Sequence, residues 1–264
     1  MSIISGTSHS SGVFYDYPIE QSLRFDGSSY LSRTFGTATS QDTMTLSMWV
    51  KRSVLATAVG TGHMVLFMAN NGNLNTVIKF AANSQLPLNG FSVDWSNHGT
   101  STSYWRGTQS VFRDTSSWYH LVWNFNSSPF KNELYVNGIL DTTYANLSGY
   151  ADPSSTYLNN NSLVHHIGRY SIINNSYFNG YLANIQFIDG QALDPYFFGE
   201  SKNGVWIPYN AFSTAGSGTA TASDGDTATD SYGTNGFHLT FEDATSTTTL
   251  GYDYSGNNNH WTLN

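Results

Sequence analysis

Carboxyl groups are the first residues to test for chemistry, because paired acids hydrolyse glycosidic bonds. A retaining hydrolase needs two carboxyl groups about 5 Å apart. The chain has four glutamates, and no two are close in sequence: Glu20, Glu133, Glu200 and Glu242. Glu242 is followed by Asp243, and neighbouring side chains of a strand point to opposite faces. We therefore expect no hydrolytic pair on one strand. A pair assembled from distant strands remains an alternative.

Other catalytic arrangements are also missing from the sequence. The chain has no cysteine, which excludes a thiol nucleophile. No Gly-x-Ser-x-Gly elbow precedes a helix, and the Gln-x-His pattern of jelly-roll lyases is absent. His165 and His166 are adjacent, so on a strand they face opposite ways and do not easily share one metal ion. We interpret His120, in the central strand, as a hydrogen-bonded structural residue. The sequence thus predicts a protein that is not an enzyme.

The run from Asp253 to Asn259 offers the hard oxygen ligands that calcium prefers. It lacks the spacing and the terminal glutamate of an EF-hand loop. An Asx-rich turn is therefore the favoured interpretation, with calcium as the alternative. We predict no cofactor.

Aromatic and polar side chains around one loop suggest ligand binding rather than catalysis. Aromatic faces stack on the C–H surfaces of pyranose rings, while amide, imidazole and guanidinium groups read hydroxyls. The candidate ligand-binding residues are Trp95, Asn97, His98, Tyr104, Trp105 and Arg106, with Tyr170 as a further candidate. The alternative is that Trp95 and Trp105 are core residues beside an ordinary loop.

The elements that must position these groups are organised around residues 117–138. Alternation predicts a strand with one fully apolar face. The two faces are Tyr119, Leu121, Trp123 and Phe125 against Trp118, His120, Val122 and Asn124. A second strand, Glu133 to Val136, ends at Asn137-Gly138, which tolerates the positive φ angles of a type I′ turn. The sequence therefore predicts a central antiparallel meander.

The rest of the chain repeats short strand patterns separated by turns. Aromatic residues make up 15% of the chain and charged residues only 11%, and there are 24 glycines. Long helical patterns are missing, and Asp194-Pro195 suits the start of one short helical turn up to Phe198. We also expect strands at 43–50, 64–68, 77–81, 91–95, 104–105, 111–112, 163–167, 181–187 and 237–241. Such spacing predicts an all-β fold, a two-sheet antiparallel β-sandwich.

The two ends differ in character from the middle. Residues 1–20 are predicted to form an N-terminal arm, either disordered or ordered by docking on a neighbouring subunit. The assembly residues of the arm would be Val13, Phe14, Tyr15 and Tyr17. Residues 21–200 are predicted to form the sandwich. Residues 201–264 are predicted to form a C-terminal extension that packs back on it, with a low-complexity loop, 213–230, too poor in apolar residues to order itself.

Charge and hydropathy limit the partners. The formal net charge is −8, and Lys51-Arg52 is the only adjacent basic pair, so we expect no nucleic-acid partner. No apolar run approaches the ~20 residues of a membrane span, so we expect no membrane insertion.

Four segments, taken in order, resemble the laminin-G/pentraxin-type concanavalin A-like fold. They are Leu23 to Leu31, Thr45 to Val50, Trp118 to Gly138, and Ile167 to Ile185, within roughly residues 20–195. This resemblance implies a jelly roll that recognises carbohydrate or protein. Three later segments resemble structural proteins of marine tailed bacteriophages: Gly204 to Pro208, Gly233 to Leu239 and Asp253 to Trp261.

Together these resemblances imply a non-enzymatic virion structural protein with a lectin-like domain. It would act as a capsid decoration, head appendage or tail fibre on the surface of the particle. The expected partners are other virion proteins of the capsid or tail and host surface glycans. A homo-oligomer is also expected, with a trimer as our choice. The alternatives are a laminarinase-type glycoside hydrolase and a soluble carbohydrate-binding lectin.

Overall fold

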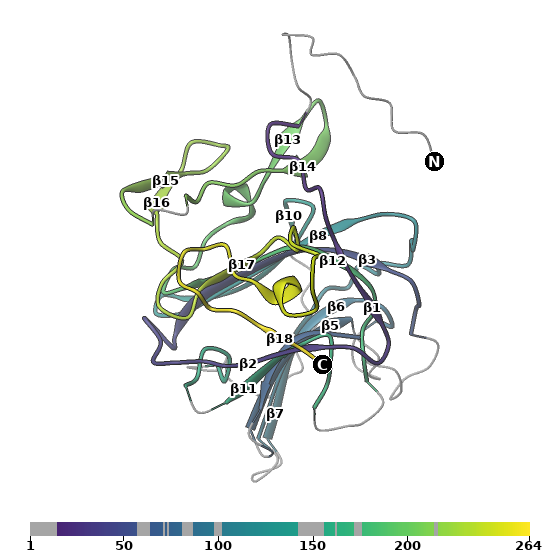
Figure 1. The fold of residues 1–264 in the computed structure, drawn as a ribbon. Coiled ribbons are helices and arrows are strands. Elements are labelled where there is room, and N and C mark those ends of the chain that lie inside the picture. The colour runs from purple at the N-terminus through teal and green to yellow at the C-terminus, as the bar shows by residue number, and fades with distance from the viewer. Residues whose placement is uncertain are drawn as a thin grey trace.

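Two antiparallel sheets packed face to face form the body of the protein (Figure 1). The prediction of an all-β sandwich is confirmed. The structure is a computed structural model, and the residues it describes are 15–56, 64–70, 72, 74–80, 87–97, 102–141, 156–161, 163–171, 176–213 and 216–264.

The first sheet contains the central meander. Its order is β1-β12-β3-β8-β9-β10. β17 pairs with β12 on the same edge as β1, further along that strand. The bounds are β1 (Leu23–Asp26), β12 (Asn179–Asp189), β3 (Thr43–Arg52), β8 (Tyr119–Ser127), β9 (Phe130–Val136), β10 (Ile139–Leu140) and β17 (Phe237–Leu239).

The second sheet packs under the first. Its order is β18-β2-β11-β4-β5-β6-β7. The bounds are β18 (Thr262–Leu263), β2 (Leu31–Thr34), β11 (Val164–Ile167), β4 (Met64–Asn70), β5 (Leu74–Phe80), β6 (Phe91–Asn97) and β7 (Thr102–Gly107). The prediction of a strand at residues 111–112 is wrong: these residues are irregular, with the Phe112 N–H donating to the Asn89 carbonyl at 3.0 Å and the Phe112 carbonyl accepting from the Arg52 guanidinium at 2.6 Å.

Two small hairpins and two 3₁₀ turns lie outside the large sheets. The hairpins pair β13 (Gly199–Lys202) with β14 (Val205–Pro208), and β15 (Thr219–Thr221) with β16 (Thr227–Thr229). The 3₁₀ turns are η1 (Pro195–Phe197) and η2 (Thr249–Gly251). The Asp194 side chain accepts from the Tyr196 N–H at 2.8 Å, which confirms the predicted helical turn. Among the described residues, no helix is long and apolar enough to span a membrane.

The core between the sheets follows the alternation of the sequence. On β8, the side chains of Leu121, Trp123 and Phe125 are completely or almost completely buried in it. Asn137 and Gly138 have φ angles of 50° and 77°, as the predicted tight turn requires. This turn returns the chain as β10, with Val136 opposite Ile139.

The outer face of the first sheet carries a second apolar layer. Val122 of β8 and Ile188 of β12 lie on this face and pack against side chains of residues 193–198, which follow β12, and of the C-terminal extension. Those side chains are Leu193, Phe197, Phe198, Phe212, Ala220, Ala222 and Tyr232. Figure 1 shows the two small hairpins lying over this sheet. The extension therefore covers part of a face that the alternation of polar and apolar residues predicts to be exposed to solvent.

The low-complexity segment 213–230, predicted to be a loop that cannot order itself, contains a hairpin. Its residues form the β15–β16 hairpin, and Ala220 and Ala222 are 1% and 3% exposed within the second layer. The apolar side chains that pack against it come from outside the segment, among them Val122 and Ile188 of the first sheet and Phe198, Phe212 and Tyr232, so the hairpin is stabilised by its neighbours rather than by its own composition.

Buried carboxylates fasten the loops at one end of the sandwich. Asp189 accepts from the backbone N–H groups of Thr39, Ser40 and Asn235 and from the Asn159 amide, at 2.6–3.0 Å. Four separate segments therefore meet at one anion. Because the Asn159 and Asn235 donors are buried and would otherwise lack this partner, the carboxylate stabilises the connections as well as the strand end.

The Asp253 carboxylate has a similar role near the C-terminus. It accepts from the His238, Ser255 and Asn259 backbone N–H groups and from the Ser255 hydroxyl, each at 2.8 Å. The Asx-rich turn predicted for this run is confirmed. The turn leads the chain into β18, which pairs with β2.

Candidate functional site

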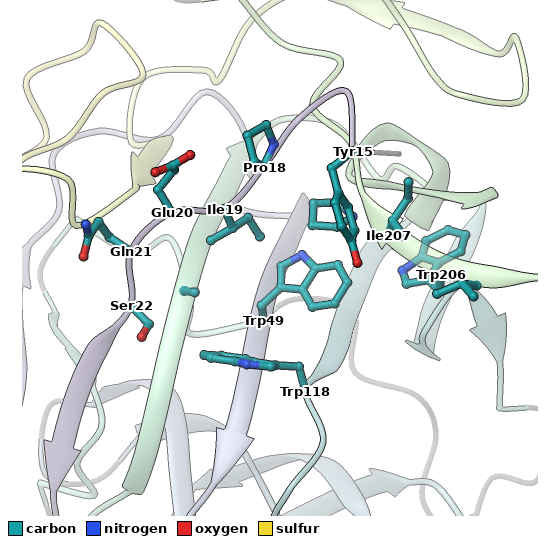
Figure 2. Close-up of a pocket in the computed structure, with 13 residues that line it drawn as sticks. Tyr15, Pro18, Ile19, Glu20, Gln21, Ser22, Trp49, Trp118, Trp206 and Ile207 are labelled. Atoms are coloured by element: carbon teal, nitrogen blue, oxygen red, sulfur yellow. The ribbon is translucent and has the colours of Figure 1, made fainter. Parts of the chain in front are cut away.

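A groove of about 540 Å³ opens on the outer face of the first sheet, beside the part covered by the extension. Four aromatic side chains line it: Tyr15, Trp49, Trp118 and Trp206. Figure 2 shows Trp49 in the middle, Trp118 below it, and Tyr15 and Trp206 to one side. The wall opposite Trp206 consists of residues 18–22, which are the end of the arm and the two residues after it.

Three separate parts of the chain supply these side chains. Trp49 comes from β3, and Trp118 directly precedes β8, the strand that pairs with β3. Trp206 belongs to β14 of the C-terminal extension. Tyr15 comes from the arm. The groove therefore exists only when arm, sandwich and extension are folded together.

His120 joins the extension to the sheet. Its Nε2 lies 2.8 Å from the Ser47 hydroxyl, and its Nδ1 accepts from Trp206 Nε1 at 2.9 Å. An indole N–H can only donate, so Nδ1 is unprotonated and Nε2 carries the proton. The ring also stacks on Trp49, with centroids 4.8 Å apart and planes at 18°. The sequence interpretation of His120 as a hydrogen-bonded structural residue is confirmed.

Two glycines allow the Trp206 ring to lie in this place. A Cβ added to Gly138 or Gly199 would come within 2.4 Å of a carbon of the ring. Gly138 belongs to the Asn137-Gly138 turn, and the Asn137 side chain accepts from the His120 backbone N–H at 2.9 Å. The turn that sets the hairpin thus also forms the seat of Trp206.

Trp49 carries a buried hydrogen-bond donor without a partner among the described residues. The residue is 8% exposed, and the donor is its indole Nε1. A buried N–H without a partner costs about 1–3 kcal/mol. The Trp49 N–H is therefore an unsatisfied polar group in a side chain that lines the groove.

The acidic groups are not arranged for hydrolysis in the groove. Glu20 is the only acid among the described residues that line it. Elsewhere, carboxylate oxygens of Asp194, Asp224 and Asp226 lie within 4.8 Å of one another. Burial, with Asp224 and Asp226 adding to it, raises the pKa of Asp194. None of these three residues lines the groove.

Among the described residues, the ligand residues predicted from sequence lie on or beside the second sheet and not in the groove. Trp95 is 2% exposed in the core, so it presents no face to a ligand; this corrects the prediction for Trp95. Arg106 lies opposite Val93 and therefore on the core side, with its guanidinium 5.6 Å from the centre of the Phe130 ring.

Two of the remaining predicted residues, Trp105 and Tyr170, lie on the outer side of the second sheet. Trp105 lies opposite Asp94, on the outer side of the second sheet. On that sheet Tyr170 packs against a small apolar cluster, and its pKa is raised by burial and then by Asp94. His98 and the side chains of Asn97 and Tyr104 lie outside the described residues.

The arm residues divide in the same way. Val13 and Phe14 lie outside the described residues. Tyr15 lines the groove, and the Tyr17 hydroxyl donates to the Asn184 side chain at 3.3 Å. Burial, helped by the charge of Glu242, raises the pKa of Tyr17 to about 12. The described part of the arm therefore docks on its own chain.

Sequence reasoning missed the groove, although two of its tryptophans carried a signal. Alternation places Trp118 with His120, and Trp49 with Ser47, on the faces expected to be polar. Large aromatic side chains on such a face mark either a covering layer or a binding surface. Trp206 offered no signal of this kind because its place depends on the docking of the extension.

Comparison with known proteins agrees with this architecture. Residues 25–195 match the family model described as the concanavalin A-like lectin/glucanases superfamily. The chain belongs to this superfamily. Among curated proteins, none is similar enough in sequence to count as a match.

Three solved structures illustrate the range of proteins that this superfamily member is similar to. A heptameric SAP-like pentraxin from Limulus polyphemus is 15% identical, with 64% of this chain and 76% of the pentraxin covered and a TM-score of 0.41. The CBM40 of the Ruminococcus gnavus IT-sialidase, bound to α2,3-sialyllactose, is 10% identical over 66% and 92%, with a TM-score of 0.45. Mouse laminin α1 domains LG4-5 are 13% identical over 72% and 46%, with a TM-score of 0.39. At these values the likenesses say nothing about the ligand of this chain.

Acidification will test the neutral state of His120. Burial lowers the pKa of His120 to about 3, against about 6.5 in the unfolded chain. The unfolded state therefore takes up the proton first, and stability is lost as pH falls below 6.5. Between pH 7 and 5 the His120 share of this loss is about 2 kcal/mol. In urea unfolding, H120Q should lose less stability over this range than the natural protein, by about that amount. An identical loss of stability in H120Q and in the natural protein would contradict the assignment of His120 as a neutral, buried imidazole.

Proposed function

We propose that this protein is a non-enzymatic carbohydrate-binding domain that holds its ligand in the aromatic groove. The observation that carries the proposal is the gathering of Trp49, Trp118, Trp206 and Tyr15 around one cavity of about 540 Å³. A concave, mainly apolar site with a few polar groups is the usual form of a small-molecule site. Flat aromatic faces suit the C–H surfaces of pyranose rings.

Hydrogen-bonding groups accompany the aromatic faces. Gln21 and Ser22, which follow the arm, line the same groove and supply both donors and acceptors. A sugar ring has apolar C–H faces and polar hydroxyl edges, so this combination matches its two kinds of surface.

The arrangement of the acidic side chains supports binding without turnover. Glycoside hydrolysis uses two carboxyl groups placed on either side of the bond, and Glu20 is alone among the described lining residues. The superfamily includes both lectins and glucanases by its description. The groove of this chain has the aromatic surface of a binding site without the acid pair of a hydrolase.

We further propose that this domain acts on the surface of a tailed-phage particle, in the capsid or the tail. This step is supported by the resemblance of segments 204–208, 233–239 and 253–261 to structural proteins of such phages. It assigns adhesion to the groove and assembly to the arm. A homo-oligomer, with a trimer as our choice, remains part of this proposal.

Replacing Trp118 will test the groove as the ligand site. In W118A, a half-buried aromatic wall is removed while the Trp206–His120 contact is kept. Affinity for oligosaccharides that the natural protein selects on a glycan array should fall at least about 30-fold, as for a central aromatic contact. Isothermal titration measures the loss.

The matched control is W105A, which removes a half-buried tryptophan from the second sheet. It should leave affinity unchanged. Loss of binding in W105A with retention in W118A would place the ligand on the loop side instead. An array on which the natural protein binds no glycan would remove the proposal altogether.

Removing residues 1–14 will test the assembly role of the arm. This deletion keeps Tyr15 and residues 18–22, so the groove wall stays in place. If the arm holds subunits together, the shortened protein should sediment as a smaller species with an unchanged melting temperature. Sedimentation at the same mass as the full chain would exclude that role.

A further inference from the structure

A row of charged and aromatic side chains crosses the first sheet next to the groove. Arg24 lies opposite Tyr181, and Tyr181 lies opposite Lys51, on the adjacent strands β1, β12 and β3. Directly opposite residues of antiparallel strands share a face. Phe25, Leu182 and Val50, their neighbours in sequence, point into the core, so this row points outward.

The row borders the groove at a fixed distance. Lys51 and Tyr181 are each two residues along their strands from the groove residues Trp49 and Ala183. Two residues of a strand span about 7 Å. The row that carries the cations therefore lies about 7 Å along the strands from the aromatic wall of the groove. This distance is close to the length of one sugar residue.

Arg24 is held in place by neighbouring groups and keeps N–H donors that can bind an anion. Arg24 donates to the Asn179 side chain at 2.9 Å and to the Gly180 carbonyl at 3.3 Å, and its guanidinium lies 5.2 Å from the centre of the Tyr181 ring. These contacts use two of the five N–H donors of a guanidinium. The side chain remains exposed.

Lys51 adds a second positive charge on the other side of Tyr181. It is half-buried, and no carboxylate of the described residues forms an ion pair with it. Tyr181 between the cations is 37% exposed. A chain with net charge −8 and ten basic residues thus places two of these on one open row beside its groove.

Glu20 places a negative charge at the end of the groove away from the two cations. It lines the groove from the arm side, whereas Lys51 and Arg24 lie beyond Trp49 on the sheet. Like charges repel and opposite charges attract over this range at low salt. An acidic group of a bound glycan is therefore disfavoured at the Glu20 end and favoured over the row.

We propose that the Arg24–Tyr181–Lys51 row is an anion subsite, which selects glycans that carry a carboxylate or sulfate one residue away from the ring in the groove. This inference rests on the proposed carbohydrate function of the groove. The guanidinium accepts a planar or tetrahedral oxyanion through paired N–H groups, and the ammonium adds a point charge. The groove supplies the aromatic contacts, and the row supplies the charge preference.

Titration with matched oligosaccharides tests the subsite. The probes are neutral hexose oligosaccharides and the same chains bearing a uronic acid, a sialic acid or a sulfate ester. In 20 mM salt the natural protein should bind at least one acidic probe about ten-fold more tightly than its neutral counterpart. In 500 mM salt this preference should shrink several-fold because the charges are screened.

Charge-neutral variants locate the effect. K51Q and R24Q should each lose most of the preference and keep the affinity for the neutral probe. K131Q is the matched control, since Lys131 is also a half-buried lysine of the first sheet and pairs with Glu133 at 3.4 Å. It should keep the preference.

The outcomes separate this inference from the function on which it rests. Binding of neutral and acidic probes with equal affinity, or an undiminished preference in K51Q and R24Q, would overturn the anion subsite and leave the carbohydrate function standing. Binding of no probe would overturn both. Carboxylated and sulfated probes, compared with each other, identify which acidic group the row takes.

Discussion

The contact between His120 and Trp206 is the constraint on which the functional face depends. A fully buried imidazole must satisfy both ring nitrogens, and the sheet itself provides only the Ser47 hydroxyl. The second partner is the indole of Trp206, which the C-terminal extension carries. Docking of the extension and burial of His120 are therefore one event, and the seat of Trp206 against Gly138 and Gly199 makes it sterically specific.

This event divides the outer face of the first sheet into two parts. Over Val122 and Ile188 the extension forms a second apolar layer, which removes that area from any ligand. At its margin, the half-buried Trp206 and the largely buried Trp49 line the groove together with Trp118 and the arm. The groove that we propose as the ligand surface is therefore the part of this face that the extension leaves uncovered. The proposal rests on its aromatic walls, and the further proposal of an acidic ligand rests on the neighbouring cations.

Most of the fold could be predicted from the sequence, since it follows from local signals. Alternation on β8, the Asn137-Gly138 turn and the Asp194-Pro195 start of a helical turn depend on neighbouring residues alone. The candidate site could not be predicted, because Trp49, Trp118 and Trp206 come together only through strand register and the docking of the C-terminal extension. Trp95 shows the same limit in reverse, since its loop context resembled a ligand site while its register buries it.

The seven tryptophans allow the central claim to be tested in one measurement. Assigned indole N–H resonances of the ¹⁵N-labelled protein, followed during titration with an oligosaccharide, report on each ring separately. Shifts in the signals of Trp49, Trp118 and Trp206, with those of Trp95 and Trp105 unmoved, are the result expected for the groove. Shifts confined to Trp105, or saturation binding that moves none of the three groove signals, would contradict it.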